Sequence, residues 1–173
     1  MEWLYPVLVL VALQRIAELM LARYNTTRLR AAGAIEHGAA HYPLFVVLHG
    51  AWLLSLAVLV PGDQAPNFIL LTIFAVLQIG RIWVIASLGR YWSTRILTIP
   101  GAPLMRRGPY RFLRHPNYAI VVAEIAILPL AFEAWAVATT FSVLNLALVG
   151  WRIRIEDAAL NERRTLSSDR KTP

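Results

Sequence analysis

The residue types best suited to chemistry gather in one basic and aromatic segment, residues 104–118. It holds four arginines, two prolines, two tyrosines, a glycine and a histidine, and a long apolar run follows it. Pro116 fits the first turn of a helix, where no backbone amide is needed, so we expect His115 at or beside the N-cap. Amides exposed there can bind an anion or a ligand carboxylate. Basic and aromatic residues also anchor helices at membrane interfaces, so this segment alone leaves a binding site and an anchor both open.

A second polar segment, residues 151–160, follows the last apolar run. Arg152 and Glu156 are four residues apart, which makes them neighbours on one face of a helix. They can pair with each other or hold a ligand that carries both charges. Exposed pairs at this spacing are common and contribute little, so the pair by itself does not indicate a site.

Polar side chains also lie inside the long apolar runs. Ionisable groups at membrane depth are costly, and they usually face the interior of a helix bundle and pair there. Arg15 and Glu18, three residues apart, are expected to neutralise each other, and pairing or packing is the expected role of most of the set. We single out Glu124, which falls in mid-span below His115, as a substrate-binding residue. The set is Gln14, Arg15, Glu18, His49, Arg81 and Glu124.

Metal and thiol chemistry find no support in the sequence. The chain has no cysteine, which excludes a disulfide framework, a thiolate metal site and a cysteine nucleophile. The four histidines, at positions 37, 41, 49 and 115, show no HExxH or comparable ligand spacing. We therefore predict that the chain binds no metal.

The composition is that of a membrane protein. Of the 173 residues 58% are hydrophobic and the mean hydropathy is +0.55, which is more apolar surface than a soluble domain of this length can bury. The net charge of +7 would suit a nucleic-acid binder, but the basic residues sit in short stretches between apolar runs, as in membrane topology. We predict contact with membrane lipid and none with nucleic acid, and no feature identifies a protein partner.

Three stretches approach the roughly 20 apolar residues that a transmembrane helix needs. They are residues 3–22, 43–61 and 67–88. The first has no basic leader and contains Arg15 and Glu18, so it is expected to be retained rather than cleaved as a signal peptide.

The next apolar stretch, residues 118–151, is long for one span and short for two, and Pro129 and Glu133 interrupt it. This pattern predicts a tight hairpin of two brief helices that turns near these two residues. The second helix is expected to continue beyond the membrane into residues 152–164. The predicted fold is all-α and polytopic, with five transmembrane helices.

Topology follows from the positions of the basic residues. They gather in residues 23–41, in residues 89–117 and in the tail from residue 152, whereas residues 62–66 and 129–133 contain none. The positive-inside rule then places the N-terminus outside and the long loop and the tail in the cytoplasm. A four-span arrangement would put the loop and the tail on opposite sides, where they could not form one site.

Taken together, the two polar segments resemble the isoprenylcysteine carboxyl methyltransferase family. The family pattern Gly-x-Tyr, four residues, His-Pro-x-Tyr is followed about 40 residues later by Arg, three residues, Glu-Glu-x-x-Leu. The matching residues here are Gly108, Tyr110, His115, Pro116, Tyr118, Arg152, Glu156, Asp157 and Leu160, with Asp157 in place of the second glutamate. The resemblance covers roughly residues 85–165, and the ordered pair of motifs is more specific than either motif alone.

The resemblance implies an enzyme that uses S-adenosylmethionine and a lipophilic acceptor. It places the acceptor near Arg152, beside which we put Glu124. Catalytic roles are expected for Arg152, which would hold an anionic acceptor, for Glu156, which would bind polar parts of the cofactor, and for His115, which would bind the cofactor or act as a base. The residues implied to surround the cofactor are Ala102, Pro103, Leu104, Met105, Tyr110, His115, Pro116, Asn117, Tyr118 and Glu156.

One membrane domain is expected over residues 1–173. Residues 1–88 would form the three N-terminal spans, residues 89–165 the cofactor-binding and catalytic region, and residues 166–173 a frayed tail. Of the basic residues all but Lys171 are arginine, which suggests a GC-rich bacterial genome and hence the inner membrane.

The acceptor is the least determined part of this interpretation. Methyl transfer is a one-step displacement in which the protein mainly aligns the groups and excludes water. A prenylcysteine carboxylate is one acceptor, but short bacterial relatives are similar to enzymes that O-methylate long-chain polyketide pyrones or resorcinols. A pyrone hydroxyl is already ionised, whereas a phenol with a pKa of about 10 needs a base, for which His115 is the candidate.

Two other function classes stay open at this point. Sterol reductases carry a related Arg-His-Pro-x-Tyr region, which allows an NADPH-dependent membrane reductase, although such chains are usually much longer. A non-catalytic lipid-binding protein would use both polar segments only to anchor its helices. Binding of S-adenosylhomocysteine or of NADPH distinguishes these classes.

Overall fold

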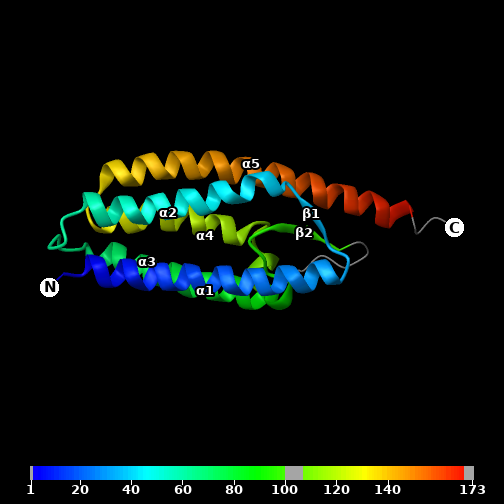
Figure 1. Ribbon diagram of the computed structural model, residues 1–173, viewed down its shortest axis with the longest axis horizontal. Helices are drawn as coiled ribbons and strands as arrows, with labels where there is room; N and C mark the ends of the chain where they lie inside the picture. The colour runs from blue at the N-terminus through cyan, green and yellow to red at the C-terminus, as the bar shows by residue number, and fades with distance from the viewer. Residues whose placement is uncertain (1, 100–106, 170–173) are drawn as a thin grey trace.

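The computed structural model describes the backbone of residues 2–99 and 107–169, and their side chains except those of residues 41 and 161–169. Within these residues five long helices run alternately in opposite directions (Figure 1). They are α1 (Leu4–Ala31), α2 (Tyr42–Leu59), α3 (Phe68–Leu88), α4 (Pro116–Ala131) and α5 (Trp135–Asp169). Short elements join them: β1 (Ile35–His37), η1 (Ala39–His41), η2 (Gly89–Tyr91), β2 (Ile96–Thr98) and η3 (Gly108–Arg111).

The predicted all-α membrane fold is confirmed. Helices α1, α2, α3 and α5 are long and apolar enough to cross a membrane. Helix α4 has 16 residues, which corresponds to about 24 Å of helix, and it packs against both α3 and α5. The shortest helix is therefore enclosed by its neighbours.

The predicted helical hairpin is also present. Helix α4 ends at Ala131 and α5 begins at Trp135. The Pro129 carbonyl accepts hydrogen bonds from the amides of Phe132 at 3.0 Å and Ala134 at 2.9 Å, which closes the turn. Helix α5 then continues unbroken through residues 152–164, as expected.

Helix α1 extends farther than its apolar run. The sequence places the end of the span near residue 22, but α1 continues to Ala31. Its last turns are fastened by side chains: Asn25 donates to the carbonyls of Gly89 at 3.2 Å and Trp92 at 2.9 Å. These bonds explain why a polar stretch outside the apolar run remains an ordered helix.

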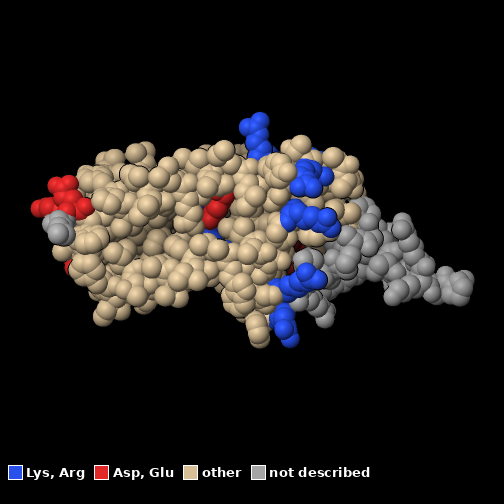
Figure 2. All heavy atoms as spheres, turned by 90° about the horizontal axis from the view of Figure 1, so that it is seen from below, with Lys and Arg blue, Asp and Glu red and all other residues tan. Residues whose placement is uncertain are grey.

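The middle of the bundle has an apolar outer surface. Large aliphatic side chains such as Leu13, Leu54, Val76 and Ile79 are more than half exposed there. Figure 2 shows the basic side chains near the end that carries the strands and acidic ones at the opposite end, with a small charged patch visible among uncharged residues in the middle. An apolar band with one basic end is the arrangement expected of a bundle that crosses a bilayer.

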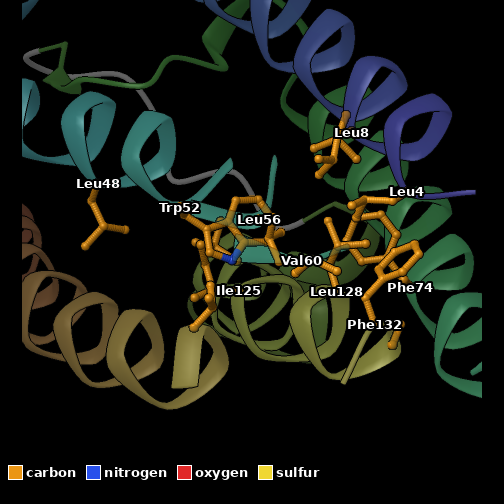
Figure 3. Packing of buried hydrophobic residues seen from close by; sticks show 14 residues of the cluster. Leu4, Leu8, Leu48, Trp52, Leu56, Val60, Phe74, Ile125, Leu128 and Phe132 are labelled. Atoms are coloured by element: carbon orange, nitrogen blue, oxygen red, sulfur yellow. The ribbon is translucent and has the colours of Figure 1, made fainter. Parts of the chain in front are cut away.

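The apolar core lies toward the end that holds the N-terminus and the α4–α5 turn. Leu4, Trp52, Leu56 and Leu128 are completely buried in it, and Figure 3 shows these side chains meeting between α1, α2, α3 and α4. The opposite end of the bundle, where the core stops, is left for polar groups.

A two-stranded sheet closes that opposite end. Strands β1 and β2 pair antiparallel, with Ile35 opposite Thr98 and His37 opposite Ile96. This pairing was not predicted, because three residues are too few to show an alternating pattern. The pair ties the α1–α2 connection to the segment after α3.

Candidate active site

The start of α4 places three of the predicted residues together. The residue before a proline is kept out of the helical conformation, so His115 is non-helical, with φ −131° and ψ 63°, and α4 begins at Pro116 as predicted. The His115 side chain makes no capping bond. Its ring instead stacks on Tyr118, with centroids 5.4 Å apart and planes inclined by 21°. His115, Asn117 and Tyr118 all line one cavity.

The turn that precedes α4 depends on Gly108. Its φ of +55° is in the left-handed region, which favours glycine, and a Cβ at this position would lie 2.1 Å from Ser87 Oγ on α3. Because η3 packs on α3, the turn carries Tyr110 to the cavity. Burial raises the pKa of Tyr110 above its ordinary value of 10.0, and the Glu156 carboxylate adds to this. The phenol therefore stays protonated and can donate a hydrogen bond.

Tyr118 connects the two residues that the sequence singles out on α5. Its hydroxyl donates to Glu156 Oε2 and accepts from Arg152 Nε at 2.7 Å. Arg152 also donates through Nη2 to the Thr94 carbonyl at 2.8 Å, and its guanidinium carbon lies 5.3 Å from the centroid of the Phe45 ring. Arg152 and Glu156 thus meet through Tyr118, and Arg152 is held in a defined position.

Two carboxylates flank His115. Asp157 Oδ1 lies 3.3 Å from His115 Nε2 and 2.9 Å from Arg114 Nη2, and Glu156 Oε1 lies 3.9 Å from His115 Nδ1. The Asp157 contacts are close in distance but lack hydrogen-bond geometry. Glu156 lines this end of the cavity and supplies a carboxylate there, whereas Asp157 is paired with Arg114.

Charged residues around the strands hold the segment that Arg152 contacts. Glu36 on β1 pairs with Arg95 at 2.5 Å and with Arg30. Burial alone would raise the pKa of Glu36, but the hydrogen bonds from Arg95 and Arg30 outweigh it and lower the pKa below the ordinary value of 4.5. Glu36 is therefore ionised at neutral pH, and its pairing keeps the backbone at Thr94 and Arg95 next to the helices.

A cavity of about 440 Å³ lies between α1, α2, α4 and α5 and contacts the polar residues at the start of α4 and on α5. This volume is in the range of ligand pockets. Ile16, Leu19 and Val46 line the cavity and are also exposed on the bundle surface, so it opens between α1 and α2 toward the bilayer. One end is lined by Tyr110, His115, Asn117, Tyr118, Arg152 and Glu156, and the other by Arg15, Glu18, His49 and Arg81.

The inner end of the cavity borders a network of buried charges from α1, α3 and α4. Glu18 accepts from Arg81 Nη2 at 2.6 Å and from Arg15 Nη1 at 2.9 Å. Glu124 accepts from Arg15 Nη2 at 2.7 Å, from Gln78 at 2.9 Å and from Arg81 Nη1 at 3.3 Å. The predicted pairing of Arg15 with Glu18 is confirmed, and two arginines balance two glutamates.

The predicted site residues fall into four groups. Pro116 is buried as the first residue of α4. Glu124 is 1% exposed and contacts Arg15 and Arg81, and those two arginines line the cavity. Tyr110, His115, Asn117, Tyr118, Arg152 and Glu156 come together at one end of the cavity. Ala102, Pro103, Leu104 and Met105 lie outside the described residues. The assigned roles of all these residues stay predictions.

The contribution of α2 and of the segment around β2 was missed. Phe45 lies below the Arg152 guanidinium, the Thr94 carbonyl fixes it, and Trp92 is 3% exposed in the same wall. None of these carries a charge or belongs to a recognisable motif. His49, a lone polar residue in an apolar run, was the one available signal that α2 faces a cavity.

Two of the histidines hydrogen-bond to other groups of the protein. His37 hydrogen-bonds with Thr98 Oγ1 at 2.8 Å, and His49 Nδ1 contacts the Phe45 carbonyl at 2.8 Å. Among the side chains that the structure describes, no group of three or more His, Asp or Glu residues is placed to hold a metal ion.

Comparison with known proteins adds an independent finding. Residues 69–162 match the isoprenylcysteine carboxyl methyltransferase (ICMT) family. The chain is similar to a protein of Bacillus subtilis (strain 168), called Uncharacterized protein YpbQ, with 42% identity over 166 residues, or 94% of this chain and 98% of that protein. A Haemophilus influenzae protein called Uncharacterized protein is 25% identical over 155 residues, or 85% and 88% of the two chains. No solved structure gives a significant match.

Proposed function

Because the chain belongs to the isoprenylcysteine carboxyl methyltransferase family, we propose that it transfers the methyl group of S-adenosylmethionine to an oxygen of a lipophilic acceptor. The family indicates the membrane methyltransferase activity, and the acceptor class is the proposal. The acceptor oxygen belongs to an acidic hydroxyl or a carboxylate, with a long-chain pyrone or resorcinol preferred over a prenylcysteine. The observation that carries the proposal is the contact of Arg152, Tyr118 and Glu156 at one end of a cavity open toward the bilayer.

The residues at this end of the cavity fit S-adenosylmethionine. The cofactor carries a sulfonium and an ammonium, and Glu156, which lines the cavity, supplies a negative charge beside His115. Asn117 Oδ1 is buried without a hydrogen-bond partner, so it can accept from a cofactor hydroxyl or amine. The stacked rings of His115 and Tyr118 offer an aromatic wall. Residues 102–105 belong to the proposed cofactor site on the basis of the family resemblance.

When bound, S-adenosylmethionine supplies an electrophilic methyl group. The chain must then place the acceptor oxygen in line and exclude water. Arg152 donates hydrogen bonds through Nε to Tyr118 and through Nη2 to the Thr94 carbonyl. Its third nitrogen, Nη1, has no hydrogen-bond partner among the described residues. That nitrogen can hold an anionic acceptor oxygen, while the Phe45 ring excludes water from below the guanidinium.

A neutral hydroxyl must lose its proton to react. His115 is the proposed acceptor of that proton, because its Nε2 is buried at the cavity without a hydrogen-bond partner. An acceptor that is already ionised would not need this step. Glu124 is proposed to act on the acceptor through Arg15 and Arg81, which it contacts and which line the cavity.

We also propose that the basic end of the bundle faces the cytoplasm of a bacterial inner membrane, with the N-terminus outside. The basic side chains near the strands support this orientation (Figure 2), by the positive-inside rule. It gives the cofactor access from the cytoplasm and the lipophilic acceptor access from the bilayer. The three N-terminal helices and the α4–α5 region would then work as one domain, because both line the cavity.

Calorimetry with S-adenosylhomocysteine tests the cofactor site in detergent-purified protein. Glu156→Ala should weaken binding about 10-fold to 100-fold, because a hydrogen bond to a charged group contributes about 1.5–3 kcal/mol. Tyr118→Phe should weaken it less, since Glu156 keeps its charge but loses the hydroxyl that orients it. Asp63→Ala, which removes a carboxylate from the opposite end, is the control.

The same titration separates the function classes. Binding of NADPH without S-adenosylhomocysteine would overturn the methyltransferase assignment in favour of a reductase. Binding of neither would favour a non-catalytic lipid-binding protein. With binding established, transfer of a labelled methyl group to an alkylpyrone, an alkylresorcinol or a farnesylcysteine analogue identifies the acceptor class.

A further inference from the structure

The inner end of the cavity contains polar groups that methyl transfer at Arg152 does not require. Arg15, Glu18, His49 and Arg81 line it. A purely hydrocarbon tail placed here would leave unpaired those polar atoms that the ion-pair network does not already satisfy, such as Arg15 Nε, which costs free energy. The polar inner end therefore indicates a ligand that carries a polar group of its own at this depth.

His49 defines which kind of polar group fits. Its Nδ1 lies 2.8 Å from the Phe45 carbonyl, and because a carbonyl only accepts, Nδ1 carries the hydrogen of this bond. In the neutral ring Nε2 is then a hydrogen-bond acceptor. A third positive charge beside Arg15 and Arg81 would have no counterion, because Glu18 and Glu124 already balance those two. The neutral ring is thus the form that fits this network.

A donor lies in the same wall. Arg15 uses Nη1 and Nη2 on Glu18 and Glu124, whereas its Nε is buried without a hydrogen-bond partner. The inner end thus offers one acceptor, His49 Nε2, and one donor, Arg15 Nε. A hydroxyl complements both, whereas a carboxylate has no hydrogen for His49 and a carbonyl has none either.

Helix α2 contributes residues both to the methyl-transfer end of the cavity and to its inner end. Phe45 lies below the Arg152 guanidinium, and His49 follows one helical turn later, which is a rise of about 6 Å. One acceptor molecule can thus present one oxygen near Arg152 and a second one to His49.

We propose that His49, with Arg15, forms a second acceptor subsite that binds a hydroxyl group other than the one that is methylated. The proposal rests on the proposed function and names the substrate class within it: a lipid that carries a second hydroxyl group besides the oxygen that is methylated. His49 is then a specificity-determining residue. A prenylcysteine, which has a hydrocarbon chain behind its carboxylate, would leave the subsite unsatisfied.

Calorimetric binding of two matched lipids tests the subsite without cofactor or turnover. The probes are an alkylresorcinol and the meta-alkylphenol of the same chain length, which lacks one hydroxyl. Wild-type protein should bind the resorcinol about tenfold more tightly, the effect of one buried hydrogen bond. Equal affinities, or no binding of either lipid, would overturn the proposal.

Two substitutions of His49 separate binding from a structural role. His49→Asn keeps an amide donor near the position of Nδ1 and removes Nε2, so the preference for the resorcinol should fall to within about twofold. His49→Gln extends an amide to the position of Nε2 and should restore the preference. Leu54→Ala on the exposed face of α2 is the control for the helix. A tenfold preference that persists in His49→Asn would refute the role of Nε2.

The outcome is distinguishable from failure of the proposed function. S-adenosylhomocysteine binding and methyl transfer are measured on the same samples. If the resorcinol preference depends on His49 while no cofactor binds, the subsite stands and the methyltransferase assignment fails. If cofactor binds and methyl is transferred but the two lipids bind equally, only the subsite fails.

Discussion

Neutralising Glu124 should destabilise the bundle, because it removes one of the two negative charges that balance two buried arginines. Glu124 is 1% exposed and accepts from Arg15, Gln78 and Arg81. Glu124→Gln keeps the size of the side chain and an acceptor oxygen for Gln78, but it leaves two buried arginines facing the single charge of Glu18. The network then carries one uncompensated positive charge at membrane depth.

The expected cost is about 3 kcal/mol, the lower end of the range for breaking a buried ion pair by removing one partner. This corresponds to a factor of roughly 100 in the unfolding equilibrium. The second variant, Arg15→Gln in the Glu124→Gln background, restores electroneutrality because Arg81 and Glu18 remain paired. It should recover about 1–2 kcal/mol, so the two substitutions should be non-additive.

The assay is unfolding of the purified protein in mixed micelles by increasing SDS, followed by helical circular dichroism for the wild type, the two single variants and the double variant. Asp63→Asn, at the opposite end of the bundle, controls for loss of a negative charge as such. A loss below about 0.5 kcal/mol for Glu124→Gln, or additive effects in the double variant, would refute the view that charge balance holds the network together.

The other predictions concern the polar end and the hairpin. Gly108→Ala should lower S-adenosylhomocysteine affinity at least tenfold, because the new Cβ would lie 2.1 Å from Ser87 Oγ and 2.9 Å from Ser87 Cβ and displace η3. Adding Ser87→Ala to this variant should restore the affinity only in part. Full affinity in Gly108→Ala alone would contradict this account. Since the pKa of Glu36 is lowered from 4.5, its ion pairs contribute stability above pH 4.5 that is lost as the pH falls below this value. The melting temperature of Glu36→Gln should therefore fall less below pH 4.5 than that of the wild type. The same dependence of melting temperature on pH in both proteins would contradict a stabilising role of the pairs. Glu133 has φ +57°, so Glu133→Gly should raise stability by about 0.5–1 kcal/mol, and a lower melting temperature would show that its side chain contributes more than the strain costs.

The long elements could be predicted from the sequence because their signals are local. Spans of apolar residues gave the helices, and the interruption at Pro129 and Glu133 gave the hairpin turn that the structure has at residues 132–134. Pro116 gave the start of α4. Each depends on length, hydropathy or the fixed φ of proline, which do not need knowledge of the rest of the fold.

The parts that could not be predicted depend on contacts between distant segments. Strands β1 and β2 are three residues each and exist only because each pairs with the other. Arg152 and Glu156 were correctly placed on one helical face, and the spacing left open a direct pair or a shared ligand. It gave no sign of Tyr118, which comes from another helix and stands between them. Phe45 and Thr94 gave no signal, since one is an ordinary apolar residue and the other acts through its backbone carbonyl.

The buried charges also explain why a cavity exists at membrane depth. In a bilayer, apolar helices gain little from packing on one another compared with packing on lipid, and polar contacts and close fit decide which helices associate. Arg15, Glu18, Arg81 and Glu124 bind α1 to α3 and α4 through charged contacts, whereas the apolar cluster joins the same helices nearer the N-terminus. Helix α1 is thus fixed at its interior face without having to fill the space beside α2. Aliphatic residues in these positions would pack into that space and fill it. Burying the charged network costs desolvation free energy, but the network also keeps the cavity open for a ligand.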